Sequence, residues 1–176
     1  MLVYGRPGTG KTTIAASFPK PILLLDIREQ GTDSVRDIEG LDVAYIDDWT
    51  EFEGALWHLK KGEGVKYKTV IIDSISMAQQ VAMNEVLHKT GQSSIDRQGW
   101  GEVSGMLNQV IYGFRELPQH LVITAHDRTR AEEGGGSDQL EPEVGPAVIP
   151  SVGKTLLGMM KVVGYSYIRE VRQKAE

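Results

Sequence analysis

The chain has 176 residues, enough for one domain of ordinary size. It contains no cysteine, which excludes disulfides, cysteine-based zinc sites and thiol nucleophiles. Its 19 Lys and Arg residues and 24 Asp and Glu residues give a net charge of −5, so a nucleic acid would need a local basic patch or an assembly of subunits. No apolar run reaches the roughly 18 residues that span a bilayer, and no signal peptide precedes the first expected strand. We therefore expect a cytoplasmic protein that does not contact membranes.

Short apolar segments alternate with amphipathic ones, which predicts a parallel sheet covered by helices on both faces. Strands are expected over residues 1–4, 21–26, 42–47, 68–73 and 120–124. Helices are expected over 11–18, 50–61, 75–88 and 103–117, with a capping box formed by Thr50 and Glu53 at the start of the second. Loops are expected over 91–101 and 127–143, and a helix (151–161) and a strand (162–171) in the tail. These elements predict a single α/β domain over 1–176.

Ligands of parallel sheets bind at the carboxyl ends of the strands. Each of the first five expected strands ends there in a glycine or a polar residue. These residues are Gly5, Asp26, Asp47, Asp73 and Thr124. This edge of the sheet is therefore the expected place for a functional site.

The turn after the first strand carries a phosphate-binding motif. Residues 5–12 read GRPGTGKT and fit G-x-x-x-x-G-K-[ST]. The glycines let backbone N–H groups face a phosphate, and the following helix adds the positive end of its dipole. Lys11 is expected to bridge the β- and γ-phosphates of ATP, and the Thr12 hydroxyl to ligate Mg²⁺. The nucleotide-contacting residues are expected to be Gly5, Arg6, Pro7, Gly8, Thr9, Gly10, Lys11, Thr12 and Thr13.

The fourth strand ends in a carboxylate, as a Walker B strand does. Residues 69–73 read TVIID, and Asp73 is therefore expected beside Mg²⁺ or its water, together with Thr12. The next residue is Ser74. The catalytic glutamate that follows the Walker B aspartate in many AAA-type ATPases is thus missing from that position.

Beyond these motifs, the sequence resembles the RecA-type ATPase core in IIDSIS, LLLDIRE and VITAHD. It is more similar still to phage-encoded ATP-binding proteins of the RecA-like single-strand annealing group, often labelled AAA-family ATPases. The segments YGRPGTGKTTIA, LPQHLVITAHD, VGPAVIPSVGK and Gly99-Trp100-Gly101 carry this similarity, which covers nearly the whole chain. It implies a P-loop NTPase fold, RecA-like, with a three-layer α/β/α sandwich and a mainly parallel sheet. Because the chain starts on the first strand and ends soon after Val171, we expect a short or truncated member.

The resemblance implies two further catalytic residues. A glutamate that activates water should follow the second strand, where Glu29 stands one residue further from Asp26 than is usual. Asp26 is therefore the alternative, and Glu29 would otherwise be a solvated loop acid. A polar residue that senses the γ-phosphate should end the fifth strand, and His126 holds that place. An imidazole can donate a hydrogen bond to phosphate from either nitrogen, although a single histidine is more often structural.

The resemblance also implies partners: single-stranded DNA, other copies of the chain in a ring or filament, and a single-strand binding protein. The implied DNA-binding stretches are 89–101 and 128–150. The first contains Lys89, Arg97 and Trp100, whose indole would either stack on a base or pack against the next helix. The second contains two arginines among several acids, and a neighbouring subunit's nucleotide is an alternative target for them. The basic residues considered for that contact are Arg128, Arg130, Lys154 and Lys161, with Lys154 preferred.

Taken together, these features predict Mg²⁺-dependent ATP hydrolysis in phage DNA recombination or single-strand annealing, in the host cytoplasm. Two alternatives remain open. A nucleoside or nucleotide kinase also begins with such a phosphate loop, and Arg128 with Arg130 would then imitate its lid. A non-catalytic DNA-binding scaffold switched by ATP would explain the displaced Glu29 and the missing glutamate after Asp73.

Overall fold

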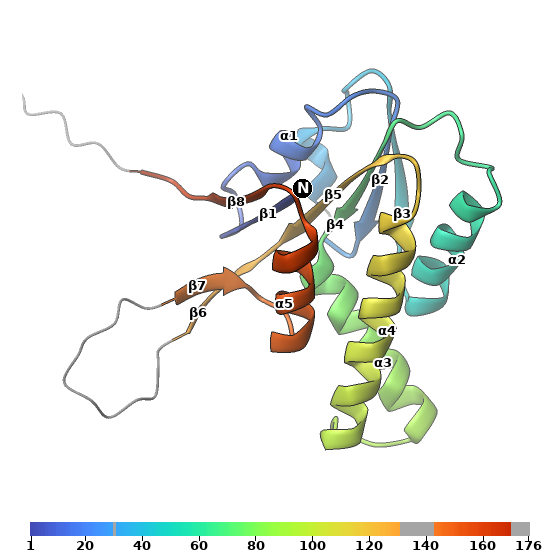
Figure 1. Cartoon of the computed structure of the whole chain (residues 1–176), viewed down its shortest axis with the longest axis vertical. Helices are drawn as coiled ribbons and strands as arrows, with labels where there is room; N and C mark the ends of the chain where they lie inside the picture. Colours follow the sequence, from blue (N-terminus) through green and yellow to red (C-terminus); the bar gives the residue numbers. More distant parts are fainter. Residues whose placement is uncertain (30, 131–142, 170–176) are drawn as a thin grey trace, which may run out of the picture.

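The computed structural model describes residues 1–29, 31–130 and 143–169, and its middle layer is a six-stranded parallel sheet (Figure 1). The strand order is β3-β2-β4-β5-β1-β8. The first five strands lie within one residue of the bounds expected from their apolar runs. The strands are β1 (Leu2–Gly5), β2 (Ile22–Ile27), β3 (Leu41–Ile46), β4 (Thr69–Asp73), β5 (His120–Ala125) and β8 (Val163–Ser166).

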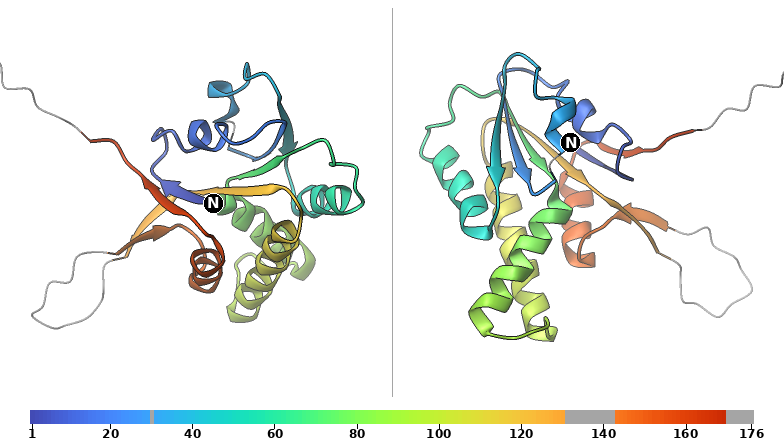
Figure 2. Two further views of the ribbon diagram at one scale, coloured as in Figure 1. Left: turned by 45° about the horizontal axis from the view of Figure 1, so that its top comes forward. Right: turned by 180° about the vertical axis from the view of Figure 1, so that it is seen from behind.

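Helices cover both faces of this sheet, as Figure 2 shows. One face carries α1 (Lys11–Ala15) and the 3₁₀ helix η1 (Gly31–Ser34). The other face carries α2 (Trp49–Lys60), α3 (Ile75–Thr90), α4 (Arg97–Arg115) and α5 (Pro150–Met159). The chain is thus a three-layer α/β/α sandwich, as predicted.

Side chains of the central strands alternate between two cores. In β4 every residue is buried, with Ile71 in the smaller core beside α1 and Ile72 in the larger core beside α2 to α5. Strands buried on both faces read as continuous apolar runs, which explains why the sheet could be predicted from sequence. The larger core includes the stacked rings of Phe52 and Phe114, whose centroids are 5.6 Å apart.

Two helix starts differ from the prediction. Helix α4 begins at Arg97, within the expected loop over 91–101, because the Asp96 carboxylate accepts a 2.7 Å hydrogen bond from the backbone N–H of Gly99. Helix α2 is capped by Asp48, which accepts from the N–H of Glu51, while Glu51 Oε2 accepts from the N–H of Asp47. The predicted capping box of Thr50 and Glu53 was therefore wrong by two residues.

Helix α1 is also shorter than the expected 11–18. After Ala15 the backbone bonds change to the tighter i→i−3 pattern, from Ser17 to Ile14 and from Phe18 to Ala15. Pro19 follows at once and cannot continue the helix.

Both ends of the expected polar loop over 127–143 belong to a two-stranded antiparallel ribbon. Strands β6 (Asp127–Arg130) and β7 (Glu143–Pro146) pair, and the N–H of Ala147 donates to the carbonyl of His126 at the base of the ribbon. The part between the two strands, 131–142, lies outside the described residues. The tail strand, expected over 162–171, is β8, which pairs with β1 and ends at Ser166. Within the described parts of the chain, no helix is long and apolar enough to cross a membrane.

The parallel arrangement brings the polar strand ends to one edge of the sheet. Asp26 at the end of β2 is the register partner of Asp73 at the end of β4. Gly5 ends β1 next to the end of β5, where Thr124 pairs with Val3. This edge holds the candidate site.

Candidate nucleotide-binding and catalytic site

The turn between β1 and α1 folds around the ammonium group of Lys11. This side chain is only 8% exposed, and its Nζ donates to the carbonyls of Gly5 (3.0 Å) and Arg6 (2.9 Å). Gly10, which precedes α1, has a left-handed φ of 83° that favours glycine. At Gly5 a Cβ atom would collide with the carbonyl of Ser166 on β8, so this position needs glycine for a close approach.

A cavity of about 390 Å³ opens in front of this turn. Its walls come from the phosphate loop, the segment after β2, and the ends of β4 and β5. The lining residues are Pro7, Gly8, Gly10, Lys11, Thr12, Thr13, Glu29, Gly31, Ser34, Asp73 and His126. Lys11, Thr12 and most of the motif residues thus share one cavity with both candidate catalytic side chains.

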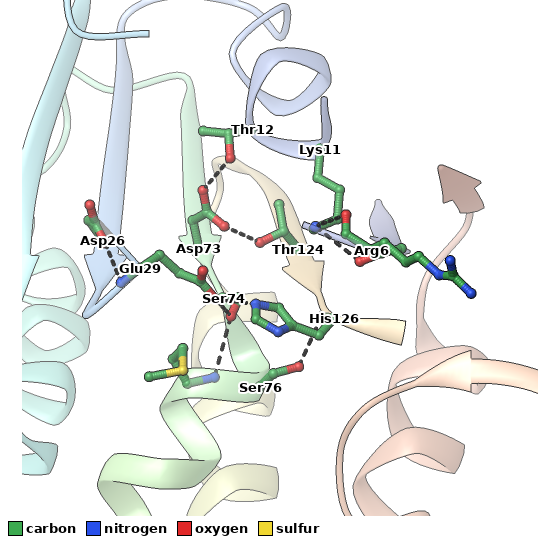
Figure 3. Close-up of polar contacts among 12 residues, drawn as sticks. Arg6, Lys11, Thr12, Asp26, Glu29, Asp73, Ser74, Ser76, Thr124 and His126 are labelled. Atoms are coloured by element: carbon green, nitrogen blue, oxygen red, sulfur yellow. Dashed lines mark hydrogen bonds and ion pairs between the residues drawn. The ribbon is translucent and has the colours of Figure 1, made fainter. Parts of the chain in front are cut away.

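Asp73 joins the phosphate loop to the neighbouring strand (Figure 3). Thr12 Oγ1 donates a 2.7 Å hydrogen bond to Asp73 Oδ2, although 61 residues separate the two. Thr124 Oγ1 donates to the other carboxylate oxygen. Asp73 is 4% exposed, so these two hydroxyls hold a buried carboxylate in a fixed orientation.

The pair Thr12 and Asp73 fits the donor chemistry of Mg²⁺. This ion prefers oxygen ligands and is usually held by one or two carboxylates together with phosphate oxygens and water. The described residues contain no group of three or more His, Cys, Asp or Glu side chains that could hold a metal alone. The site therefore suits a metal that arrives with the phosphates of a nucleotide.

Glu29 enters the cavity through a turn directly after β2. Arg28 adopts a left-handed conformation with φ 55°, and the N–H of Glu29 donates a 2.9 Å hydrogen bond to Asp26 Oδ1. This turn accommodates the additional residue between Asp26 and Glu29. Asp26 is 2% exposed and does not line the cavity, whereas Glu29 does. Of the two carboxylates, the geometry favours Glu29 as the group that can reach a water near the phosphates.

One carboxylate oxygen of Glu29 receives two contacts. Ser74 Oγ donates to Glu29 Oε1, and His126 Nε2 lies 2.6 Å from the same atom (Figure 3). Ser74 also caps α3 by accepting from the N–H of Met77 at 3.3 Å. The backbone N–H of His126 donates to Ser76 Oγ, which fixes the start of the segment after β5.

These contacts shift the pKa values of Glu29 and His126 in the directions that favour an ion pair. Burial raises the pKa of Glu29, but hydrogen bonds from His126 and Ser74 outweigh it, and the net pKa lies below its usual 4.5. The hydrogen bond to Glu29 raises the pKa of His126 above its usual 6.5, against the opposing effect of burial. An imidazolium facing a carboxylate is therefore favoured at mildly acidic pH.

The predicted phosphate-loop residues divide between two cavities. Pro7, Gly8, Gly10 and Lys11 to Thr13 line the cavity described above, and Gly5 contributes its carbonyl to Lys11. Arg6 and Thr9 face a second cavity of about 570 Å³ beside β8. Pro7 lines both, and the remaining walls of the second cavity are Tyr165, Ser166, Tyr167 and Ile168. Ser166 Oγ donates to the Thr9 carbonyl at 2.6 Å, so β8 supports the loop.

Several site residues were not assigned roles from the sequence. Ser74 donates a hydrogen bond to the Glu29 carboxylate, and Thr124 donates one to the Asp73 carboxylate. Gly31 and Ser34 of η1 line the cavity. Ser74 could have been found as the cap of the helix after β4, since serine is a preferred N-cap. The role of Thr124 follows only from the order of strands in the sheet.

The stretches expected to bind DNA are partly brought together. Lys89 pairs with Glu85 at 3.2 Å, Arg97 is exposed, and Trp100 is 39% exposed on α4. Trp100 and Arg128, one from each stretch, line a common pocket. Lys154 and Lys161 are exposed, whereas the side chain of Arg130 lies outside the described part of the structure.

Comparison with known proteins identifies a family for the chain. The sequence model of a family described as AAA domain matches residues 1–176. No curated protein matches the sequence.

Proposed function

We propose that this chain, which belongs to the AAA domain family of P-loop NTPases, binds ATP with Mg²⁺ and hydrolyses it. One observation carries this proposal. Glu29 lines the same cavity as Lys11, Thr12 and Asp73, so a carboxylate able to activate water stands beside the phosphate and metal ligands.

In this proposal, each residue of the phosphate cavity has its own role in hydrolysis. Lys11 supplies positive charge to the phosphates, and its ammonium has a third N–H beyond the two that reach Gly5 and Arg6. Mg²⁺, when bound, neutralises charge that develops on the phosphate oxygens. Glu29 orients the attacking water and takes its proton, with Oε2 as the accepting atom because Oε1 already holds Ser74 and His126. Positioned base catalysis of this kind contributes on the order of 10²–10⁴ in rate.

The two alternatives have less support. As a kinase, the protein would need Arg128 over the phosphates, but this residue lines a different pocket with Trp100. As a non-catalytic switch, it would lack a carboxylate near the phosphates, and the place of Glu29 in the cavity argues against that.

We further propose, on the resemblance to phage annealing proteins, that the ATPase works in DNA recombination as an assembly of subunits on single-stranded DNA. Exposed Arg97 at the start of α4 supports a contact with phosphates. The turn between α3 and α4, where α4 begins, lies at the far end of these helices from the sheet (Figure 1).

An ATPase assay with sizing tests both proposals. Phosphate release from ATP is measured with Mg²⁺, with and without a thymidine oligonucleotide, beside light scattering of the same samples. We expect Mg²⁺-dependent release that the oligonucleotide increases, and particles larger than one chain. Lys11→Ala is the control for contaminating ATPases. Transfer of phosphate to a nucleoside, without release to water, would instead establish a kinase.

A further inference from the structure

The cavity of about 570 Å³ beside β8 adjoins the phosphate cavity. It is lined by Arg6, Pro7 and Thr9 of the phosphate loop and by residues 165–168, at the end of β8 and just beyond it. Pro7 also lines the phosphate cavity, so the two cavities meet at this residue. Its volume is typical of a small-molecule site, which is roughly 300–1,000 Å³. A molecule whose phosphates occupy the first cavity therefore has room for a further group in the second.

Tyrosine rings gather on this side of the phosphate loop. The ring centroid of Tyr165 on β8 lies 5.4 Å from that of Tyr4 on the neighbouring strand β1. The Tyr165 ring also stacks with the ring of Tyr167, with centroids 5.8 Å apart and an interplanar angle of 19°. Tyr167 is the more exposed of this stacked pair, at 64% against 42% for Tyr165. Its ring is thus supported by Tyr165 and still open to a flat ligand.

We propose that Tyr167 stacks on the base of the bound nucleoside triphosphate, and that the cavity holds this base by its face and not by its edge. The ligand class is then purine nucleoside triphosphates, with GTP accepted as well as ATP. Stacking on an aromatic ring tolerates different bases because every base has a π-face. This inference rests on the proposed function, since the triphosphate must lie at Lys11 for its base to reach Tyr167.

The hydroxyl groups around the cavity are engaged within the protein. Thr9 Oγ1 donates to the carbonyl of Arg6 at 2.8 Å, and Ser166 Oγ donates to the carbonyl of Thr9 at 2.6 Å. Tyr165 Oη donates to Asp127 Oδ2 at 3.3 Å. Amide and carboxylate side chains, which could distinguish the edges of adenine and guanine, do not occur among the described residues that line the cavity.

Arg6 is the charged side chain among these lining residues, and it is exposed. A guanidinium donates hydrogen bonds and accepts none. Adenine and guanine both carry an acceptor at N7, so a contact there does not separate them. A pyrimidine has one ring in place of two and covers less of the tyrosine ring, so CTP should bind more weakly than either purine nucleotide.

Titration calorimetry on the full chain with Mg²⁺ tests the proposal. The ligands are the β,γ-imido analogues of ATP, GTP and CTP, which resist hydrolysis, and inorganic tripolyphosphate, which has no base. We expect the two purine analogues to bind within about threefold of each other and the cytidine analogue to bind more weakly. Tripolyphosphate should bind about tenfold more weakly than the purine analogues or worse, because it lacks the stacked base.

Variants of exposed tyrosines then locate the base. Tyr167→Ala should weaken both purine analogues by about tenfold and leave tripolyphosphate binding unchanged. Tyr167→Phe keeps the ring and should bind like the unmodified chain. Tyr45→Ala is the matched control, because Tyr45 is similarly exposed, at 58%, and lies on β3 at the opposite edge of the sheet from β8. It should bind all the ligands normally.

An affinity difference of about tenfold or more between the adenosine and guanosine analogues would overturn the inference, because the base would then be recognised at its edge. Tripolyphosphate binding as tight as that of the nucleotides, or normal purine binding by Tyr167→Ala, would also overturn it. Binding of none of these ligands would contradict the proposed function and this inference together. Binding of the purine analogues that depends on Tyr167, without hydrolysis of ATP, would support this inference and contradict the proposed ATPase alone.

Discussion

Glu29 and His126 stand 97 residues apart in the sequence and meet through a 2.6 Å contact between Oε1 and Nε2 (Figure 3). Glu29 follows β2 and His126 follows β5, the two strands that flank β4 in the sheet. Ser74, directly after β4, lies between them and donates to the same oxygen. Three neighbouring strands therefore hold one carboxylate in the phosphate cavity, and the predictions below start from that arrangement.

Glu29→Gln should lower ATP hydrolysis by on the order of 10²–10⁴ while ATP still binds. The amide keeps the shape of the side chain and one acceptor oxygen but cannot take a proton from water. Single-turnover hydrolysis and equilibrium binding of a fluorescent ATP analogue separate the two effects.

Asp26→Asn is the matched control for this prediction. Asp26 holds the turn through the N–H of Glu29 but does not line the cavity, so its loss should reduce the rate less than Glu29→Gln does. A larger defect at Asp26 would show that the wrong carboxylate has been assigned as the base.

The contribution of His126 to folding stability should depend on pH. Its pKa is raised above 6.5 by Glu29, so its stabilisation is complete below pH 6.5 and is lost as the pH rises through the raised pKa. The pKa of Glu29 is lowered, so its share is present above pH 4.5 and is lost as the pH falls through the lowered value. The pair therefore stabilises the fold most between about pH 4.5 and 6.5.

Urea unfolding of the unmodified chain and of His126→Gln measures this effect. We expect the free energy of unfolding to differ by on the order of 1 kcal/mol at pH 5.5, where the pair is charged, and by less at pH 8.5. A difference that is the same at both pH values would mean that the imidazole acts through neutral packing or hydrogen bonding alone.

Much of the sheet could be predicted because buried parallel strands leave continuous apolar runs, as in TVIID of β4. The start of α4 could not, because Gly99 and Gly101 favour a loop locally. The Asp96 cap and the burial of Val103 and Leu107 outweigh that preference. The ribbon of β6 and β7 depends on pairing between segments that are separated in sequence, and no local pattern reveals it.

The site was predictable to the extent that it is a local motif. Lys11 and Thr12 stand at fixed positions of the phosphate-loop motif, and Asp73 ends an apolar strand, so residue type and position are enough to predict these three site residues. The hydroxyl of Thr124 on Asp73 requires knowing that β5 lies beside β4. Likewise, the pocket that Trp100 and Arg128 line together brings residues from α3, α4, β6 and 147–150 to one place, which no local pattern in the sequence reveals.

Lys11→Ala should abolish binding or turnover of nucleoside triphosphates. The carbonyls of Gly5 and Arg6 hold the Lys11 ammonium inside the phosphate loop, and the substitution removes this positive charge. Titration calorimetry with ATP and Mg²⁺ measures the loss. Affinity and turnover equal to those of the unmodified chain would contradict the assignment of the phosphate loop.

Asp73→Asn should spare much of the ATP binding and remove Mg²⁺-dependent hydrolysis. The amide can still accept the hydrogen bond from Thr12 but carries no negative charge for the metal. Hydrolysis is measured over a range of Mg²⁺ concentrations, with Asp47→Asn as the control, since Asp47 follows β3 and does not line the cavity. Normal hydrolysis in Asp73→Asn would exclude Asp73 as the Walker B residue.

The last prediction concerns assembly. Of the described residues that line the phosphate cavity, Lys11 is the only lysine or arginine. We predict that a neighbouring subunit supplies a further cation to the charge that develops in the transition state. Lys154 is our choice, because it is exposed in the second turn of α5 and is available to a neighbour. Turnover per subunit should then rise with protein concentration, and Lys154→Ala should remove that rise without weakening ATP binding.

Mixing variants tests the same interface more directly. Lys154→Ala subunits keep the phosphate loop, and Lys11→Ala subunits keep Lys154, so a mixture should recover part of the activity that each lacks alone. Lys161→Ala, which removes an exposed lysine beyond α5, is the control and should behave like the unmodified chain. Turnover that is independent of concentration in a strictly monomeric protein would rule out a contribution from a neighbour, because each site would then work with its own residues.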